Sequence, residues 1–305
     1  MEHYRSLNST LQEQFGEKVY KLALDGGFTC PTRDGTKGTG GCIFCAGGSG
    51  DFSVPVGENV EEAIETAKSV VAEKGAGKFI AYYQSYTGTY APVDRLRRLY
   101  TQTIQHPDVV ALSIGTRPDC LEEETIELLS ELNTRKPVWI ELGLQTIHTE
   151  TAEYIHRGYP LPVFDDAVRR LRERGITVVV HMIIGLPGET PEMIWQTAEY
   201  IGRSGAQGIK LQLLHVLEGT ALAEDYLAGK FRALSLEEYI ELLEQCIERI
   251  PPEMVVHRLT GDGAKRSLIA PLWSADKKRV LNEINRAFER DAIRQGSKFV
   301  HDAQM

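Results

Sequence analysis

CPTRDGTKGTGGCIFC, residues 30–45, places three of the chain's five cysteines in one glycine-rich loop: Cys30, Cys42 and Cys45. Their spacing is C-x11-C-x2-C. A strand-like apolar run over residues 19–24 leads into the loop, and a helix-like run begins near Glu58. Thiolates are soft ligands, so three of them at the end of a strand predict a metal site. Three protein ligands also leave one coordination position open, as a catalytic metal centre requires.

The surrounding sequence narrows the kind of metal. A structural zinc ion takes four protein ligands, and no histidine occurs between His3 and His106 to complete a local set. A [4Fe-4S] cluster with three cysteine ligands and one free iron fits better, and glycines let the backbone approach it closely. Three alternatives stay open: a zinc site, a thioredoxin-like pair of Cys42 and Cys45, and buried cysteines in a flexible loop.

Composition and charge are those of an ordinary globular protein. The chain has 305 residues, of which 42% are hydrophobic and 25% charged, and its formal net charge is −9. This charge argues against a general affinity for nucleic acid. No apolar run approaches the ~18 residues of a membrane helix, and the first ten residues are too polar for a secretory signal. Because the cysteines form no disulfide framework, we expect a cytoplasmic protein. Because no apolar run is long enough for a membrane helix, we expect no membrane partner.

Apolar runs that suit buried strands alternate with helix-like runs. The strand-like runs cover residues 19–24, 79–83, 109–114, 138–142, 176–184 and 209–214. The helix-like runs cover residues 60–73, 93–105, 122–132, 149–155 with 163–174, and 191–203. Six such units with near-continuous apolar strands predict a parallel α/β sheet. We expect an N-terminal extension (1–17), a core (18–235) and a C-terminal α/β segment packed on it (236–305).

Polar residues follow several strand-like runs and are candidates for binding. Residues 83–90 mix tyrosines with hydroxyl and amide side chains. Arg117 can pair with a carboxylate or phosphate through its planar guanidinium, whereas Asp119 is expected to cap the next helix. Glu141 lies within an apolar run, where an unpartnered carboxylate is costly, and this favours a functional partner. An exposed polar loop and a surface arginine are the alternatives for residues 83–90 and for Arg157.

These motifs resemble the radical S-adenosylmethionine (SAM) enzymes over residues 15–260. Most of that superfamily has a tighter C-x3-C-x2-C motif with an aromatic residue before the last cysteine. Phe44 matches the aromatic, and the widened first gap resembles the Elongator-protein-3-like branch. The further matching motifs are Thr116-Arg117-Pro118-Asp119, Glu141-Leu142-Gly143-Leu144-Gln145-Thr146, His156-Arg157-Gly158 and Gly185-Leu186-Pro187-Gly188-Glu189-Thr190.

The resemblance implies a partial (β/α)6 TIM-like barrel, with functional groups at the carboxyl ends of the strands. It implies a [4Fe-4S] cluster on the three loop cysteines and SAM as the second cofactor. The residues implied to bind SAM are Phe44, Gln84, Ser85, Glu141, Gln145, Arg157 and Ile184. Arg117, Gln212 and His215 are expected to face substrate, and no catalytic residue is assigned. A flavodoxin- or ferredoxin-type donor would reduce the cluster, which would cleave SAM to methionine and a 5′-deoxyadenosyl radical.

The sequence specifies the substrate less well than it specifies the fold and the cofactors. The Elongator-like branch implies modification of the wobble uridine of tRNA, but the chain is too short for the acetyltransferase domain that follows the core in Elongator protein 3. A related change to an aminomethyl-type side chain already on the base stays open. RNA would need a local basic face, and we expect it in the C-terminal segment, at Lys265, Arg266, Lys277, Lys278 and Arg279. The alternatives are radical modification of a small metabolite or peptide, and a noncatalytic zinc or iron–sulfur protein.

Overall fold

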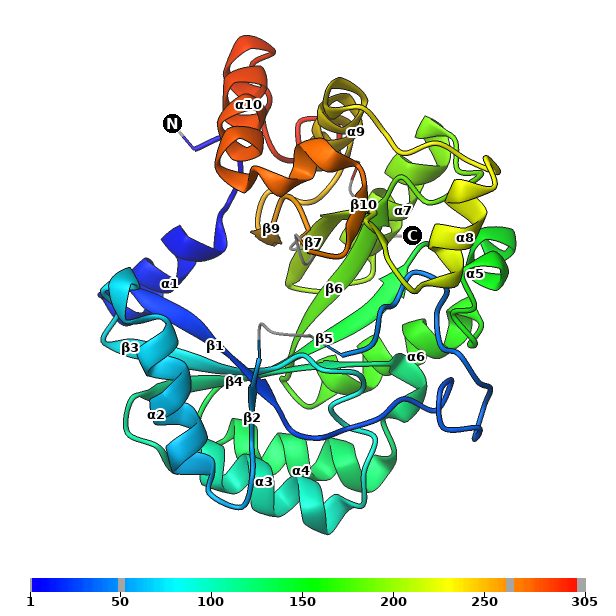
Figure 1. The fold of residues 1–305 in the computed structure, drawn as a ribbon. Coiled ribbons are helices and arrows are strands. Elements are labelled where there is room, and N and C mark those ends of the chain that lie inside the picture. Colours follow the sequence, from blue (N-terminus) through cyan, green and yellow to red (C-terminus); the bar gives the residue numbers. More distant parts are fainter. Residues whose placement is uncertain (1, 49–52, 262–265, 301–305) are drawn as a thin grey trace.

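A curled sheet dominates the computed structural model, which describes residues 2–48, 53–261 and 266–300. Its eight strands are all parallel, in the order β2-β1-β3-β4-β5-β6-β7-β9, and they form an open barrel (Figure 1). The strands are β1 Val19–Asp25, β2 Val54–Pro55, β3 Lys78–Tyr83, β4 Val109–Thr116, β5 Val138–Gln145, β6 Thr177–Ile184, β7 Gly208–Leu213 and β9 Val255–Arg258. Because the strands are parallel, their carboxyl ends lie at one rim, which we call the mouth.

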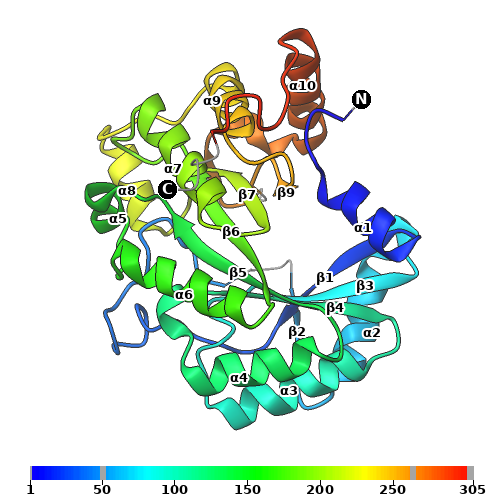
Figure 2. The same cartoon turned by 180° about the vertical axis from the view of Figure 1, so that it is seen from behind.

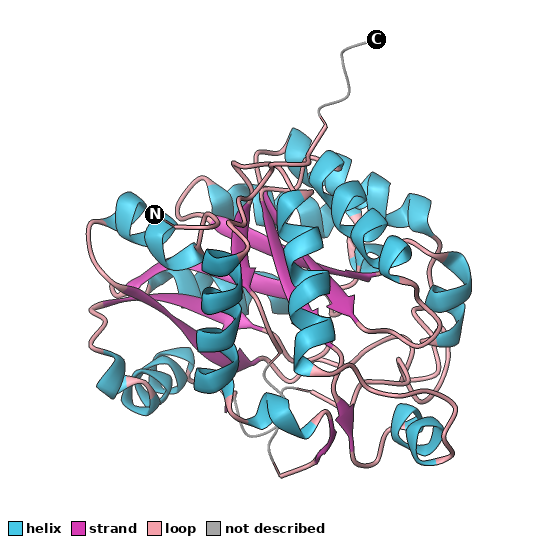
Figure 3. Cartoon of the chain, turned by 90° about the horizontal axis from the view of Figure 1, so that it is seen from above, coloured by secondary structure: helices cyan, strands magenta, loops and turns pink. Residues whose placement is uncertain are grey.

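Helices surround the curled sheet, and most of them cover its outer face (Figures 2 and 3). They are α1 Leu7–Phe15, α2 Val60–Val70, α3 Val93–Gln105, α4 Glu123–Asn133, α5 Thr149–Tyr154, α6 Leu161–Glu173, α7 Pro191–Arg203, α8 Ala221–Leu227, α9 Leu236–Glu248 and α10 Lys277–Arg290. Alternate strand residues, such as Leu22 and Leu24 on β1, form the main hydrophobic core beneath the helices. A small antiparallel ribbon, β8 Val216–Leu217 with β10 Leu268–Ala270, lies outside the sheet.

The sheet confirms the partial-barrel fold expected from the sequence. All six expected strands are present, and α3 and α7 begin and end at the expected residues. The sequence patterns do not reveal β2 and β9, because two and four residues are too few to show a strand period. In the part of the chain that the structure describes, no helix is long and apolar enough to cross a membrane.

The amino-terminal end of the barrel is closed by α1. Leu11 packs there against Val19, Ile80, Ala111 and Trp139, which come from β1, β3, β4 and β5. These are interior-facing positions, one residue out of phase with the core under the helices. With this end filled by apolar side chains, binding groups are sought at the mouth.

The segment before α1 and the segment after α10 meet beside β9. The N-terminal segment pairs in parallel with β9 through Ser6. The side chain of Gln295 adds three bonds: its Oε1 accepts from Arg5 N at 2.8 Å, and its Nε2 donates to Pro251 O and Met254 O at 2.7 Å each. One amide therefore ties the segment before α1 to the loop before β9, at the edge of the sheet.

Replacing Gln295 by alanine should lower the free energy of unfolding by roughly 1–3 kcal/mol, because three hydrogen bonds of modest net worth are lost together. Urea unfolding of the whole chain measures this change. Gln102→Ala, at an exposed position of α3, is the matched control. Equal stability of the Gln295 and Gln102 variants would contradict a closing role for this amide.

Candidate metal centre

Two tight turns shape the cysteine loop. The carbonyl of Cys30 accepts hydrogen bonds from the backbone N–H groups of Arg33 (2.8 Å) and Asp34 (3.1 Å), so the chain reverses directly after the first cysteine. A second turn is closed by Cys45 N, which donates to Cys42 O at 3.0 Å. The intervening residues return the chain so that the second and third cysteines approach the first.

The loop is held at the mouth by backbone bonds to three other segments. Ile43 N donates to Ile155 O (3.2 Å), next to α5, and Leu222 N of α8 donates to Ile43 O (3.0 Å). Thr87 N, in the loop after β3, donates to Thr29 O (3.3 Å). Figure 1 shows the dark blue loop running beside α5 and α8. The three cysteines therefore lie where the strand-end residues are, as the sequence analysis expects.

The three loop thiols are available as ligands, and another candidate metal group lies elsewhere in the described chain. All three are free and partly exposed. Among the described residues, Glu65, His106 and Asp108 bring three ligand atoms within 4.8 Å of one another. In that acidic group the Lys68 ammonium, 2.7 Å from Glu65 and 2.6 Å from Asp108, already supplies a cation.

The two remaining cysteines are packed, as the sequence analysis favours for Cys120. Cys120 is buried after β4 with its thiol 3.8 Å from Asp119 Oδ1, and Cys246 is fully buried on α9. Burial raises the pKa of each thiol to about 12. Both are therefore explained as packed side chains.

Three arginines surround the cysteine loop, and we call them the arginine collar: Arg33, Arg117 and Arg157. Arg117 is 8% exposed and donates to Asp119 Oδ1 (2.9 Å) and to Arg157 O (2.8 Å). Arg157 is 3% exposed and donates to three backbone carbonyls. Among the described residues the collar pairs with one carboxylate, Asp119. Its positive charge therefore exceeds its negative charge, which an anionic cluster on three thiolates would balance.

The collar also affects the protonation of the Cys42 thiol. Burial raises the pKa of Cys42 to about 12, and the charges of Arg117 and Arg33 oppose this rise. A metal binds the thiolate, so the arginines favour the form that binds. Burial would lower the pKa of Arg33, but its interactions with Cys45, Tyr86 and Cys30 outweigh burial and raise that pKa.

Asp119 does not cap the following helix, and that expectation is wrong. The N-cap of α4 is Glu122. The Asp119 carboxylate instead pairs with Arg117 and with Lys37, whose Nζ lies 2.7 Å away. Burial would raise the pKa of Asp119, but its bonds to Arg117 and Lys37 hold the value below normal. Asp119 thus connects the collar to the cysteine loop.

Backbone strain and unpaired polar atoms concentrate at the mouth. Of four non-glycine residues with positive φ in the described chain, three lie there: Tyr86 (56°), Gln145 (70°) and His156 (54°). Such conformations cost on the order of 1–3 kcal/mol each and cluster at functional sites. The buried Gln145 Oε1 and Thr87 Oγ1 have no hydrogen-bond partner within the described residues. The amino and hydroxyl groups of SAM are donors that would satisfy them.

Three further residues expected to bind SAM also lie near the loop. Gln84, directly after β3, donates to Ser53 Oγ at 3.3 Å. Ser85 is 1% exposed. Phe44 packs on a small apolar cluster beneath the cysteine loop, which includes Ile43 and Leu214. Their binding role stays a prediction.

Residues of β6 and β7 divide between the two faces of the sheet. Ile183 belongs to the apolar cluster beneath the cysteine loop, whereas Ile184 lies in the core under the helices. The Ile184 side chain, expected to contact SAM, faces away from the loop because strand residues alternate, and the inward position is Ile183. Gln212 pairs in register with Ile183 and is half-buried. The ring of His215 lies against Gly261, where a Cβ would come within 2.6 Å.

Glu141 is the centre of a buried group of polar side chains inside the barrel. We call this group the interior charge cluster: Lys21, Tyr82, Ser113, Glu141, His181 and Lys210. Glu141 Oε1 accepts from Lys21 Nζ and Ser113 Oγ, both at 2.7 Å. Its Oε2 lies 2.7 Å from His181 Nε2 and also contacts Lys210 Nζ. Four protein partners therefore engage the carboxylate that the sequence analysis assigns to SAM, and that assignment stays a prediction.

Charges within this cluster shift each other's ionisation. Burial would raise the pKa of Glu141, but Lys21 and Lys210 reverse the effect and hold it well below normal. Burial lowers the pKa of Lys210 to about 7 and that of His181 to about 4. The sequence does not single out either lysine as a functional residue. Each lies in an apolar strand, however, where the argument used for Glu141 also applies.

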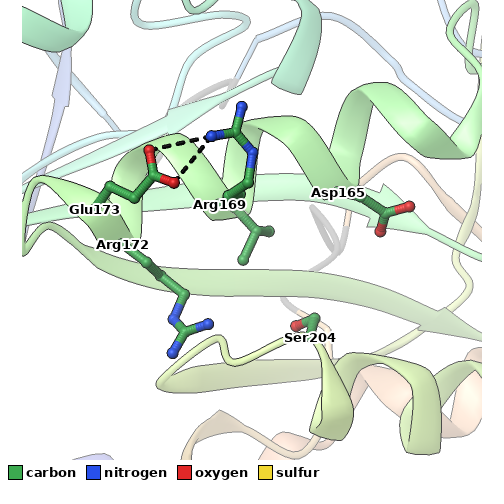
Figure 4. A pocket seen from close by; sticks show the side chains of 6 residues that line it. Asp165, Arg169, Arg172, Glu173 and Ser204 are labelled. Carbon is green, nitrogen blue, oxygen red and sulfur yellow. Dashed lines mark hydrogen bonds and ion pairs between the residues drawn. The ribbon is translucent and has the colours of Figure 1, made fainter.

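A surface hollow of about 400 Å³ lies away from the mouth, beside α6 and the residue that follows α7 (Figure 4). Its lining includes Asp165, Arg169, Arg172, Glu173 and Ser204. Arg169 pairs there with Glu173 at 2.9 Å, and both side chains are more than half exposed. Since no residue expected to bind a cofactor lines it, this hollow is not the candidate site.

Comparison with known proteins relates the chain to one superfamily. Residues 35–201 match the model of the radical SAM superfamily, and residues 206–290 match the radical SAM C-terminal domain. Over 298 residues the chain is 45% identical to the uncharacterized protein YtqA of Bacillus subtilis (strain 168), covering 97% of this chain and 92% of that protein.

Two other similarities concern proteins of the Elongator type. The chain is 30% identical over 164 residues to the tRNA uridine(34) acetyltransferase of Methanocaldococcus jannaschii, covering 53% of this chain and 30% of that protein. The structure of archaeal Methanocaldococcus infernus Elp3 with an N-terminal deletion matches with a TM-score of 0.71 and 19% identity, over 91% of this chain and 64% of that one. The chain thus spans less than two thirds of both proteins, and the structural likeness concerns the fold.

Replacing Glu141 by glutamine should lower the free energy of unfolding at pH 7 by roughly 3–5 kcal/mol, because the variant leaves buried ammonium groups without a counter-charge. The pKa of Glu141 is lower in the folded than in the unfolded chain, where it is about 4.3. Its stabilisation is therefore present above that pH and lost as the pH falls through the folded value. Urea unfolding at several pH values should show the two proteins converging in acid.

Glu192→Gln, an exposed change on α7, is the matched control. A Glu141 variant as stable as this control would contradict the central role of the carboxylate. Measuring the SAM affinity of the same proteins tests whether Glu141 also contacts SAM. If Glu141 contacts SAM, its variant loses affinity under conditions in which it is still fully folded.

Proposed function

The chain belongs to the radical SAM superfamily, and we propose that it modifies the wobble uridine of a tRNA. It is an enzyme whose cofactors are a [4Fe-4S] cluster and SAM. We assign Cys30, Cys42 and Cys45 as the ligands of the cluster. The observation that carries the assignment of the cofactor site is the position of these cysteines at the mouth beside unpaired polar atoms.

Cys30, Cys42 and Cys45 would hold the cluster, which would supply the electron for reductive cleavage of SAM and so for radical chemistry on the substrate. The residues of the chain position SAM for this step. Gln145 and Thr87 would accept hydrogen bonds from its polar groups, since both have a buried oxygen to satisfy. Phe44 and Ile183 would shield the site from water with the apolar cluster beneath the loop.

Arg117 and Gln212 are proposed to face the substrate at the mouth of the barrel. Arg117 is held by Asp119 and by the carbonyl of Arg157, so its guanidinium keeps one orientation. A fixed guanidinium suits a carboxylate or a phosphate. Gln212 lies in register with Ile183, on the interior face.

An RNA substrate is supported by the similarity to the tRNA uridine(34) acetyltransferase and by a basic segment next to the mouth. Ser267 O accepts from Glu218 N at 2.8 Å, directly after β8, so the neighbouring Arg266 lies near the ends of the strands. Three exposed cations, Lys277, Lys278 and Arg279, form the first turn of α10, which holds no acidic residue. The positive end of the helix dipole adds to their charge. Lys265, also expected in this face, lies outside the described residues.

The cluster assignment predicts iron content. Anaerobically reconstituted protein should hold about four irons and four sulfides per chain, and with a strong reductant it should release 5′-deoxyadenosine and methionine from SAM. Cys30→Ala, Cys42→Ala and Cys45→Ala should each lose the cluster. Cys120→Ala and Cys246→Ala should keep it, because both thiols are buried side chains that do not belong to the cysteine loop. Stoichiometric zinc without charge-transfer absorbance would refute the assignment.

The basic face predicts salt-sensitive tRNA binding. The affinity should fall as salt rises, with a log–log slope of about −0.7 to −0.9 per phosphate contact. Changing Lys277, Lys278 and Arg279 to glutamate should weaken binding and make the slope shallower by roughly 2 units, while substrate-free SAM cleavage stays unchanged. A filter-binding titration at several salt concentrations measures both quantities.

Three exposed arginines of the outer layer serve as the control for charge reversal: Arg98, Arg135 and Arg172. Their change to glutamate alters the net charge equally and should leave the salt slope in place. If the two triple variants behave alike, tRNA does not contact the start of α10. If the wild type shows no salt-sensitive binding at all, a small metabolite or a peptide becomes the better substrate.

A further inference from the structure

We propose that Arg33 sets the reduction potential of the cluster, by placing an uncompensated positive charge beside the two ends of the cysteine loop. The inference rests on the ligand assignment proposed above. It gives a function to a residue that the sequence motifs do not single out.

Arg33 bridges the two ends of the loop. Its backbone N–H donates to Cys30 O at 2.8 Å, and its guanidinium Nη2 donates to the carbonyl of Cys45. The side chain therefore spans from the turn of the first ligand to the last ligand. One of these bonds is made by the backbone and one by the side chain, so Arg33 is tied to two of the three cysteine positions.

Packing fixes the guanidinium in this place. Gly41, with φ of 76°, lies against it so closely that a Cβ there would come within 2.7 Å of Arg33 Nε. On another side the ring of Tyr86 lies 5.8 Å from the guanidinium carbon, within reach of a cation–π contact. The charge is thus held near the ligands and does not extend freely into solvent.

The charge of Arg33 is not neutralised by the protein. Within residues 2–48, 53–261 and 266–300, Arg33 forms no ion pair with a carboxylate, whereas Arg117 pairs with Asp119. Arg33 is also half-buried, so solvent screens it less than an exposed arginine.

A positive charge in this place favours the reduced cluster. A [4Fe-4S] cluster on three thiolates is anionic, and one added electron makes it more negative. A nearby cation therefore stabilises the reduced form more than the oxidised form, and raises the potential. The electron comes from an external one-electron reductant of low potential, which leaves oxidised, and no bond is made or broken in this step.

Potentiometry of reconstituted protein without SAM or substrate tests the proposal. Arg33→Met should bind the same amount of iron as the wild type, with a lower midpoint potential. We expect a tenfold or larger change in the reduction equilibrium, which is ~59 mV for one electron. Arg33→Lys, which keeps the charge, should fall between the two. Arg98→Met, on the outer face of α3, should not shift the potential.

Arg33→Gln separates charge from loop support, because its amide can still donate to the Cys45 carbonyl. It should keep the iron and show the lowered potential. An unchanged midpoint in Arg33→Met and Arg33→Gln, with full iron content, would overturn the proposal. Loss of iron from both variants would also overturn it, since Arg33 would then hold the loop in shape. A wild type that binds no cluster would refute the ligand assignment itself.

Discussion

The carboxylate of Glu141 is the interaction on which the barrel depends. Together with its partners it connects side chains of β1, β3, β4, β5, β6 and β7 across the interior. Two lysines converge on this one acid, so the interior tolerates their charge only while Glu141 stays in place. The apolar layer with Leu11 fills the barrel on one side of this cluster. The space left for cofactor and substrate is therefore at the mouth, where the cysteine loop lies.

The mouth combines a rigid frame with a poorly compensated charge. Backbone bonds fix the loop to α5, α8 and the segment after β3, while Arg117 and Arg157 are buried beside it with few acidic partners. Strained backbone at Gln145 and unpaired oxygens occur in the same region. The strained backbone, the unpaired oxygens and the buried arginines each cost stability, so a protein without ligands gains nothing from them. An anionic cluster and a polar cofactor offset these costs together.

The sequence predicts six strands of the sheet, the helices between them and the cysteine loop, because apolar periodicity and thiol spacing are local properties. It does not predict on which face of β6 a given residue lies, since a shift of one position exchanges Ile183 for Ile184. The partners of Asp119 are hidden for a different reason: Lys37 is far away in the chain, and the sequence motif favours a helix cap. The same holds for Lys21, Lys210 and Glu141, which meet only when the sheet curls. Arg33 is not predicted from the sequence, because the cysteines on either side of it define the metal-binding pattern.

The nucleosides of total tRNA, compared between cells with and without the gene, test the central claim most directly. Mass spectrometry of the digested tRNA should show one wobble uridine derivative lost and its precursor accumulated. The wild-type gene should restore the derivative, and a gene encoding Cys42→Ala should not, because the chemistry requires the cluster. Identical nucleoside profiles in all strains would contradict the claim that this radical SAM enzyme acts on tRNA.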